Sequence, residues 1–169
     1  MSYATTLLTT SHDKAQFTCG KVMLDDYIRK QAKQDMKGKV AACFVLSDDH
    51  KEIKGYYTLS NGSIPRSQIP EDFIKNLPKY KDLPVTLLGR LAISHKFQGQ
   101  KLGSLLLIDA LKRSLDTALN SIASMAVIVD PIDEQAIDFY TKYGFITLPD
   151  SKRMFLPMGT INQLFKSTF

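Results

Sequence analysis

The sequence predicts a single mixed α/β domain spanning residues 1–169, and three observations support this class. The chain has 169 residues, 44% of them apolar, which is the size and composition of one compact domain with a hydrophobic core. Apolar runs rich in β-branched residues predict strands, and segments with helical periodicity predict helices. Strands alternate with helices only in the second half, which favours a mixed sheet over a fully wound parallel one.

An amphipathic helix is predicted early in the chain, at residues 21–36. Its apolar residues recur at helical spacing and are expected to share one face: Leu24, Tyr27, Ile28 and Ala32. Charge pairs four residues apart are expected on the other face: Asp25 with Arg29, and Asp26 with Lys30.

Two strands are expected next, at residues 40–47 and 52–60, because both segments are rich in β-branched and aromatic residues and the polar DDHK separates them. The pair Asn61-Gly62 is expected to end the second strand. Three prolines make residues 63–83 the least regular region, with a short helix near Glu71 to Leu77. The segment PVTLLGRLAIS that follows, up to Ser94, predicts an almost uninterrupted apolar strand.

The second half alternates helix and strand. Residues 102–119 predict a long helix that is apolar nearly all round. A polar stripe is expected to form its one solvent-exposed edge: Asp109, Lys112, Arg113 and Asp116. A buried strand is expected at residues 124–130. Asp130, Pro131 and Asp133 are expected to supply an N-cap, a proline in the first helical position and an acidic first turn for the next helix. Short strands are expected around FITL and RMFLPM.

The composition excludes several kinds of site. No apolar run approaches the roughly 20 residues of a membrane span, and the N-terminus lacks the features of a signal peptide, so we expect a cytoplasmic protein without a membrane partner. Two cysteines and three dispersed histidines show no metal-ligand spacing, so no metal site is expected. The net charge of +5 favours anionic partners such as nucleotides, CoA or RNA, although a solvated basic face is the commoner explanation.

A glycine loop, QGQKLG at residues 98–103, connects the apolar strand to the long helix. The first amides of a helix have no internal partners and the helix dipole favours an anion there, so the loop is a candidate pyrophosphate site. Gly99 and Gly103 would let the main chain approach such a ligand closely. Taken alone, the loop is explained equally well as a plain strand-to-helix connection.

A second motif, FYTKYGF at residues 139–145, lies on the helix after the next strand. The loop and this motif, in this order, resemble the GNAT-family N-acetyltransferases. Gln98 and Gly103 match the family's acetyl-CoA loop, whereas Lys101 replaces its usual middle glycine. The resemblance covers roughly residues 10–165. It implies a GNAT-type fold: a central, mostly antiparallel twisted sheet with helices on both faces and a splayed parallel strand pair that holds acetyl-CoA.

The resemblance also implies which residues bind acetyl-CoA. The strand edge would pair with the pantetheine arm through Leu91, Ala92 and Ile93. The loop amides would hold the pyrophosphate: Gln98, Gly99, Gln100, Lys101, Leu102, Gly103 and Ser104. Lys96 and Lys101 would add positive charge, although exposed lysines more often stay solvated.

Tyr140 matches the family's general acid, which would protonate the CoA thiolate after an amine attacks the thioester. The pKa of a phenol is about 10 and that of a thiol about 8.5, so proton donation needs only modest tuning. Packing on the apolar helix face beside Phe139 is the alternative role for this tyrosine. At pH 7 an α-amine is about 10% neutral and a lysine less than about 0.1%, which favours aminoacyl-tRNA, small α-amines or protein N-termini as acceptors.

The segments FTCGKVMLDDYIRKQA and LLGRLAIS resemble in particular the acetyltransferase toxins of bacterial type II toxin-antitoxin modules. That resemblance implies acetylation of the α-amine of aminoacyl-tRNA, inhibition of translation, a ribbon-helix-helix antitoxin and, often, a homodimer. Candidate contacts to RNA phosphate are Arg90, Arg29, Lys30 and Lys33. Two alternatives stay open: a GNAT enzyme for a small-molecule or protein amine, and a non-catalytic module that binds CoA or a partner.

Overall fold

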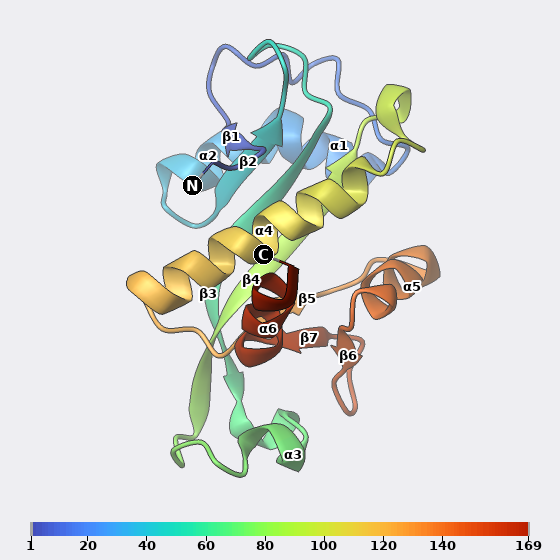
Figure 1. Ribbon diagram of the computed structural model, residues 1–169. Helices are drawn as coiled ribbons and strands as arrows, with labels where there is room; N and C mark the ends of the chain where they lie inside the picture. Colours follow the sequence, from blue (N-terminus) through green and yellow to red (C-terminus); the bar gives the residue numbers. More distant parts are fainter. Residues whose placement is uncertain (1, 169) are drawn as a thin grey trace. The chain divides into compact units, whose positions relative to one another are not determined.

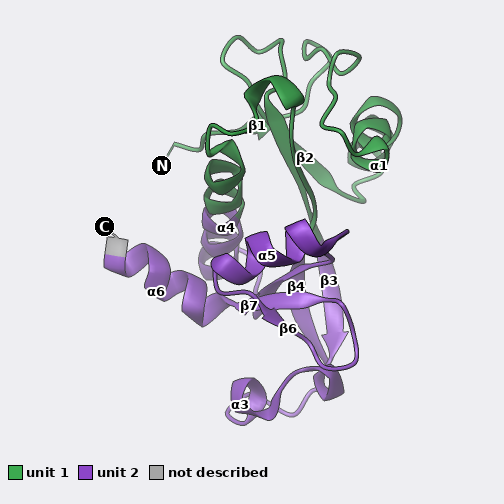
Figure 2. Ribbon diagram, turned by 90° about the vertical axis from the view of Figure 1, so that its right-hand side faces the viewer, with its two compact units in different colours: residues 1–60, 89–110 green, residues 61–88, 111–169 purple. Residues whose placement is uncertain are grey.

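The computed structural model describes residues 2–168, which group into two compact units (Figure 2). Unit 1 comprises residues 1–60 and 89–110, and unit 2 comprises residues 61–88 and 111–169. The boundaries fall inside two strands and one long helix rather than in linkers. The single domain over residues 1–169 stays a prediction.

Within the described residues, seven strands form an open sheet in the order β1-β2-β3-β4-β5-β7-β6 (Figure 1). Their bounds are β1 (Thr6–Leu7), β2 (Ala42–Leu46), β3 (Gly55–Pro65), β4 (Asp82–Ile93), β5 (Ala126–Val129), β6 (Ile146–Thr147) and β7 (Met154–Pro157). Strands β4 and β5 run parallel, whereas β1–β2, β2–β3, β5–β7 and β6–β7 are antiparallel. This is the predicted mixed α/β class, with one parallel pair in a mostly antiparallel sheet.

Unit 1 contains, after β1, a helical segment in three parts: α1 (Val22–Asp26), a π-helical turn (Tyr27–Gln31) and α2 (Ala32–Lys37). The predicted apolar face is confirmed, because its four residues are each 8% exposed or less. They pack in one core with side chains of the N-terminal segment and strands β2, β3 and β4, among them Phe17, Cys43, Val45, Tyr56 and Ala92.

Only one of the two charge pairs expected on this helix is present. Lys30 lies 3.4 Å from Asp26, as predicted. Asp25 is instead buried and accepts a hydrogen bond from the main-chain N–H of Cys19 at 2.8 Å. The Asp25–Arg29 pair is therefore a wrong prediction. Each side chain has another partner, because Arg29 donates to the Phe17 carbonyl while Asp25 accepts from Cys19.

Strand β3 continues past Asn61-Gly62, so the prediction that this pair ends the strand is wrong. Gly62 uses no left-handed conformation, and a Cβ added to it would lie 3.5 Å from Val85 of β4. Ile64 is 1% exposed and belongs to the core of unit 2. Burial of this isoleucine therefore outweighs the local turn preference of the Asn-Gly pair.

Unit 2 contains the C-terminal end of β3, the first part of β4, and the elements that follow residue 110. A 3₁₀ turn (Arg66–Gln68) and α3 (Glu71–Ile74) lie between β3 and β4, and α5 (Glu134–Lys142) and α6 (Met158–Thr168) follow later in the chain. Its core gathers aliphatic side chains around Phe155: Ile64, Ile69, Ile74, Leu83, Val85, Ala126, Ile128 and Leu148. Helix α6 begins directly at the end of β7 and was not predicted.

Two local predictions about helices need correction. Asp109 lies on α4 (Leu102–Asn120) but is only 5% exposed, so it is not part of a solvent-exposed stripe. Its carboxylate accepts hydrogen bonds from the Ala4 N–H and from the hydroxyls of Thr5 and Tyr57 at 2.6–2.7 Å. Helix α5 begins after the N-cap Asp133, which accepts from the Ala136 N–H, so Pro131 precedes the helix rather than occupying its first position.

Candidate active site

The C-terminal half of β4 extends beyond its pairing with β5. The parallel register runs from Thr86↔Val127 to Leu88↔Val129, so Gly89–Ile93 continue past the last paired residue. Main-chain N–H and C=O groups on such a strand edge are strong hydrogen-bonding groups that need a partner. This is the splayed parallel pair that the sequence resemblance implies, and Leu91, Ala92 and Ile93 lie on its free segment.

The loop after β4 is held in place by segments far away in the sequence. The Gln98 side-chain amide donates to the carbonyls of Cys19 and Ile93, both at 3.0 Å. The main-chain N–H of His95 donates to the Thr18 carbonyl at 2.8 Å. The N–H of Gln98 itself donates to the His95 carbonyl at 3.3 Å, within the 3₁₀ turn His95–Phe97. Gln98 therefore supports the loop, and its own amide is already engaged.

The backbone of the loop combines two left-handed residues with main-chain N–H groups that can bind a ligand. Gly99 and Lys101 both have left-handed conformations, with φ of +81° and +61°. Within residues 2–168, the main-chain N–H groups of Gly99 through Gly103 have no hydrogen-bond acceptor. Left-handed residues that interrupt a right-handed backbone create anion-binding concavities, and the N-terminus of α4 adds its dipole. The loop geometry fits a pyrophosphate.

Lys101 adopts this left-handed conformation where the family usually has glycine. A left-handed backbone costs a residue with a Cβ roughly 1–2 kcal/mol, so this lysine carries a strain that glycine would avoid. Its side chain is exposed and makes no ion pair within the described residues.

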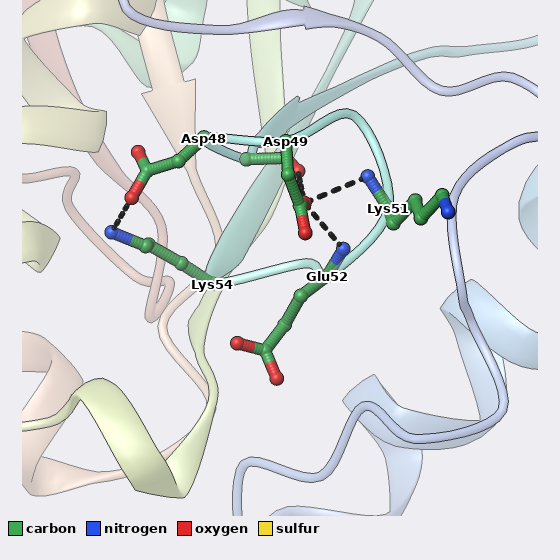
Figure 3. Close-up of polar contacts among 6 residues, drawn as sticks. Asp48, Asp49, Lys51, Glu52 and Lys54 are labelled. Carbon is green, nitrogen blue, oxygen red and sulfur yellow. Dashed lines mark hydrogen bonds and ion pairs between the residues drawn. The ribbon is translucent and has the colours of Figure 1, made fainter.

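Lys96 is engaged elsewhere and does not offer a free charge to the loop. Its Nζ lies 2.7 Å from the Glu52 carboxylate. Figure 3 shows how the turn before β3 holds this glutamate, because the Asp49 carboxylate accepts from the N–H groups of Lys51 and Glu52, both at 2.9 Å. The Lys96 charge is therefore paired with the turn before β3 rather than directed to the glycine loop.

Gly20 is a supporting residue that the sequence analysis missed. Its φ is +92°, and a Cβ added there would lie 2.8 Å from Nε2 of His95. Thr18, Cys19 and Gly20 therefore contact the start of the loop: the first two accept hydrogen bonds from His95 and Gln98, and Gly20 leaves room for the His95 ring. In the sequence this glycine is indistinguishable from one that merely precedes a helix, because its contact partner lies 75 residues further along the chain.

Tyr140 lies near the end of α5 with a buried ring. Its ring centroid is 5.2 Å from those of Phe139 and Phe145 in edge-on arrangements. Its hydroxyl has no hydrogen-bond partner within residues 2–168, yet it is not among their fully enclosed unpartnered polar atoms. The oxygen is therefore accessible although the residue is only 7% exposed. Burial raises the pKa of Tyr140 well above its usual value, so the phenol is protonated at neutral pH and is available as a proton donor.

The four cationic residues expected to contact RNA differ in their surroundings. The Arg29 guanidinium donates to the Phe17 carbonyl, and Lys30 pairs with Asp26 while remaining exposed. Lys33 is exposed and has no ion-pair partner in the described part of the chain. The Arg90 guanidinium lies 3.6 Å from the centroid of the Tyr27 ring.

Two features are absent from residues 2–168. No group of three or more His, Cys, Asp or Glu side chains is arranged to hold a metal ion. None of the helices formed by these residues has both the length and the apolar character needed to cross a bilayer.

Comparisons with known proteins agree with this geometry. Residues 39–147 match the acetyltransferase (GNAT) domain family. A tRNA-acetylating toxin of Mycobacterium tuberculosis is 35% identical over 142 residues, which is 84% of this chain and 83% of the relative. A probable toxin TacT of Sinorhizobium fredii is 30% identical over 162 residues, which is 90% of this chain and 89% of the relative.

Solved structures share the whole fold. A tyrosine-to-phenylalanine mutant of KacT has a TM-score of 0.88 at 27% identity, covering 98% of this chain and 100% of the KacT chain. AtaT complexed with acetyl-methionyl-tRNAfMet has a TM-score of 0.87 at 27% identity, covering 97% of this chain and 99% of the AtaT chain. With the family match, the relatives covered over more than four-fifths of their length and the splayed strand pair taken together, the chain belongs to the GNAT family of N-acetyltransferases.

Proposed function

We propose that this N-acetyltransferase transfers an acetyl group from acetyl-CoA to the α-amine of aminoacyl-tRNA and thereby blocks translation as a toxin. The observation that carries the proposal is similarity along nearly the whole chain to a tRNA-acetylating toxin and to AtaT, which was solved with an acetylated methionyl-tRNA. A similarity confined to the acetyl-CoA half would leave the acceptor open. Here it covers more than four-fifths of both chains.

Acetyl-CoA would bind along β4 and the loop that follows. Along the unpaired edge of Leu91, Ala92 and Ile93, the first and last of these residues would offer main-chain groups to the pantetheine amides. The open amides of Gly99 through Gly103 offer donors to the pyrophosphate, followed by Ser104 in the first turn of α4. A related structure, AtaTR bound with AcCoA, has a TM-score of 0.83 to this chain.

In the transfer step, the neutral amine attacks the thioester carbonyl carbon, and the carbon–sulfur bond breaks. Tyr140 would give its phenolic proton to the departing thiolate, while the amine releases a proton to solvent. An apolar environment raises the pKa of a thiol as it raises the pKa of the phenol, so the two shifts offset each other during proton transfer. The phenol then recovers its proton from water.

The acceptor RNA would be held by positive charge. Arg90 and Lys33 have no anionic partner among the described residues, and the exposed Lys30 would join them at the cost of its pair with Asp26. Arg29 already donates to a carbonyl and would act through its remaining donors. Since aminoacyl-tRNA is a cytoplasmic substrate, we place the activity in the cytoplasm.

Control of the activity would fall to a partner protein. AtaT has been solved bound to the C-terminus of the antitoxin AtaR, and KacTA has been solved with DNA. We propose a ribbon-helix-helix antitoxin for this chain as well. Light scattering on the purified protein tests the homodimer that the resemblance also implies.

A cell-free translation assay tests the proposed function. Adding the protein together with acetyl-CoA should stop synthesis of a reporter, whereas adding either one alone should not. The Tyr140→Phe variant should leave synthesis running, and Tyr143→Phe at the C-cap of the same helix serves as a matched control that should still inhibit. Inhibition that does not depend on acetyl-CoA would contradict acetylation as the cause.

A further inference from the structure

The Arg90 side chain has an unusual environment for a cation. It is half-buried, and its guanidinium lies over the Tyr27 ring at 3.6 Å. An arginine has five N–H donors, and a partly buried one normally uses some of them on carboxylates or carbonyls. Within residues 2–168, Arg90 makes no such hydrogen bond or ion pair. Its position is held by an aromatic face, which leaves the donors open.

The Tyr27 ring is itself fixed from two sides. Its hydroxyl donates to Oδ2 of Asp35 at 2.9 Å, and the residue is 6% exposed. Behind it the Tyr56 ring stacks at 6.2 Å with an interplanar angle of 17°. The second oxygen of Asp35 accepts from the Gln31 amide at 2.8 Å. Each Asp35 oxygen thus already accepts one hydrogen bond, and within residues 2–168 this carboxylate forms no ion pair with the arginine.

The π-helical turn explains how Tyr27 and Asp35 meet. Eight residues of α-helix rotate about 800°, which leaves two side chains about 80° apart around the axis. A π-helical turn accommodates one extra residue, so residues 27 and 35 are related roughly as seven residues are in an α-helix, within about 20° of the same face. The wide turn Tyr27–Gln31 thus aligns the tyrosine hydroxyl with the aspartate.

We infer that Tyr27 and Asp35 are positioning residues, which hold the Arg90 guanidinium in one orientation with its donors directed to a phosphate of the acceptor RNA. The inference rests on the proposed function. The planar guanidinium matches phosphate oxygens in pairs, so a fixed orientation favours binding more than charge alone does. The pKa of Asp35 lies below its usual value, chiefly because Gln31 donates to it, with smaller contributions from the Tyr27 hydroxyl and the Arg90 charge.

A double-mutant cycle tests this inference, with bulk aminoacylated tRNA as the acceptor and saturating acetyl-CoA. Arg90→Ala should raise the acceptor KM about ten-fold and leave the acetyl-CoA KM unchanged. Tyr27→Leu should raise the acceptor KM about three- to ten-fold in the wild-type background and not at all in Arg90→Ala. Tyr56→Phe is the matched control, because it removes a buried hydroxyl bonded to the Leu24 carbonyl but keeps the stacked ring. It should lower the melting temperature and leave the acceptor KM unchanged.

A rescue experiment covers the case in which Tyr27→Leu does not fold. Tyr27→Phe keeps the ring but frees one oxygen of Asp35, which can then pair with Arg90, so the acceptor KM should rise. The double variant Tyr27→Phe/Asp35→Asn removes the carboxylate charge and should bring the acceptor KM back to the wild-type value. Additive effects in the cycle, or no rescue, would overturn the positioning role. An unchanged KM in Arg90→Ala would overturn it too, whereas absence of transfer to aminoacyl-tRNA by the wild-type protein would overturn the proposed function itself.

Discussion

Replacing Tyr140 with phenylalanine removes one oxygen atom from a ring that is packed between Phe139 and Phe145. Because the hydroxyl has no hydrogen-bond partner among residues 2–168, its removal leaves no other donor or acceptor unsatisfied there. We therefore expect the free energy of unfolding to change by no more than about 0.5 kcal/mol. The binding constant for acetyl-CoA should not change either, because the proposed contacts to CoA come from β4 and its loop.

The effect on turnover should be large by comparison. A positioned general acid contributes about 10²- to 10⁴-fold, which corresponds to about 2.7–5.4 kcal/mol in the barrier. Since burial holds the pKa of Tyr140 above its usual value, the phenol stays protonated as the pH rises. The wild-type kcat should therefore show no falling limb between about pH 7 and 9.5 from loss of this proton.

The assay is release of free CoA thiol under saturating substrates, with calorimetry for acetyl-CoA binding and thermal unfolding for stability. Tyr143→Phe is the control and should keep most of the turnover. An unchanged kcat in Tyr140→Phe would remove this residue from the mechanism. A loss of acetyl-CoA affinity or of stability that matches the loss of activity would assign it a packing role instead.

Three further substitutions probe the loop and its supports. Lys101→Gly relieves a left-handed strain of about 1–2 kcal/mol at an entropic cost of about 0.5–1 kcal/mol, so urea unfolding should show it up to about 1.5 kcal/mol more stable than Lys101→Gln. Asp109→Asn leaves at least one of the three donors from Ala4, Thr5 and Tyr57 without an acceptor, and should cost about 2–3 kcal/mol in the same measurement. Burial lowers the pKa of His12 below its usual 6.5. The contribution of the neutral imidazole to stability is therefore complete above pH 6.5 and is lost as the pH falls. Between about pH 7.5 and 5, the wild type should lose more unfolding free energy than His12→Asn.

Each of these substitutions has a contradicting result. A glycine variant at residue 101 that is less stable than the glutamine variant would mean that the left-handed geometry carries no strain. A neutral Asp109→Asn would mean that the three donors find water instead. Equal pH dependence in wild type and His12→Asn would mean that this imidazole can be protonated in the folded protein.

Burial explains what the sequence could predict. Leu24, Ile28 and Ala32 recur at helical spacing because they must share one buried face, and the structure buries all three. The same holds for the apolar strand at Asp82–Ile93 and for the long helix that follows it. Each of these segments buries apolar side chains at the period of its own secondary structure, so local periodicity is sufficient to locate it.

Contacts between distant segments explain what the sequence could not predict. Asp109 appeared solvent-exposed because its donors come from a strand and a terminus more than 50 residues away. The left-handed backbone at Lys101 cannot be inferred from a lysine, which rarely adopts it. The short helix α6 was missed because Gly159 and Thr160 weaken its helical propensity, although Ile161 anchors it fully buried.

The most direct test of the account is transfer of labelled acetyl from acetyl-CoA to tRNA in a single turnover. After nuclease digestion, mass spectrometry of the tRNA 3′ end should show an N-acetylated aminoacyl-adenosine. Uncharged tRNA should take up no label, and Tyr140→Phe should form the product at least about a hundred-fold more slowly. Label on uncharged tRNA, or transfer only to free amines and proteins while charged tRNA stays unmodified, would contradict the account.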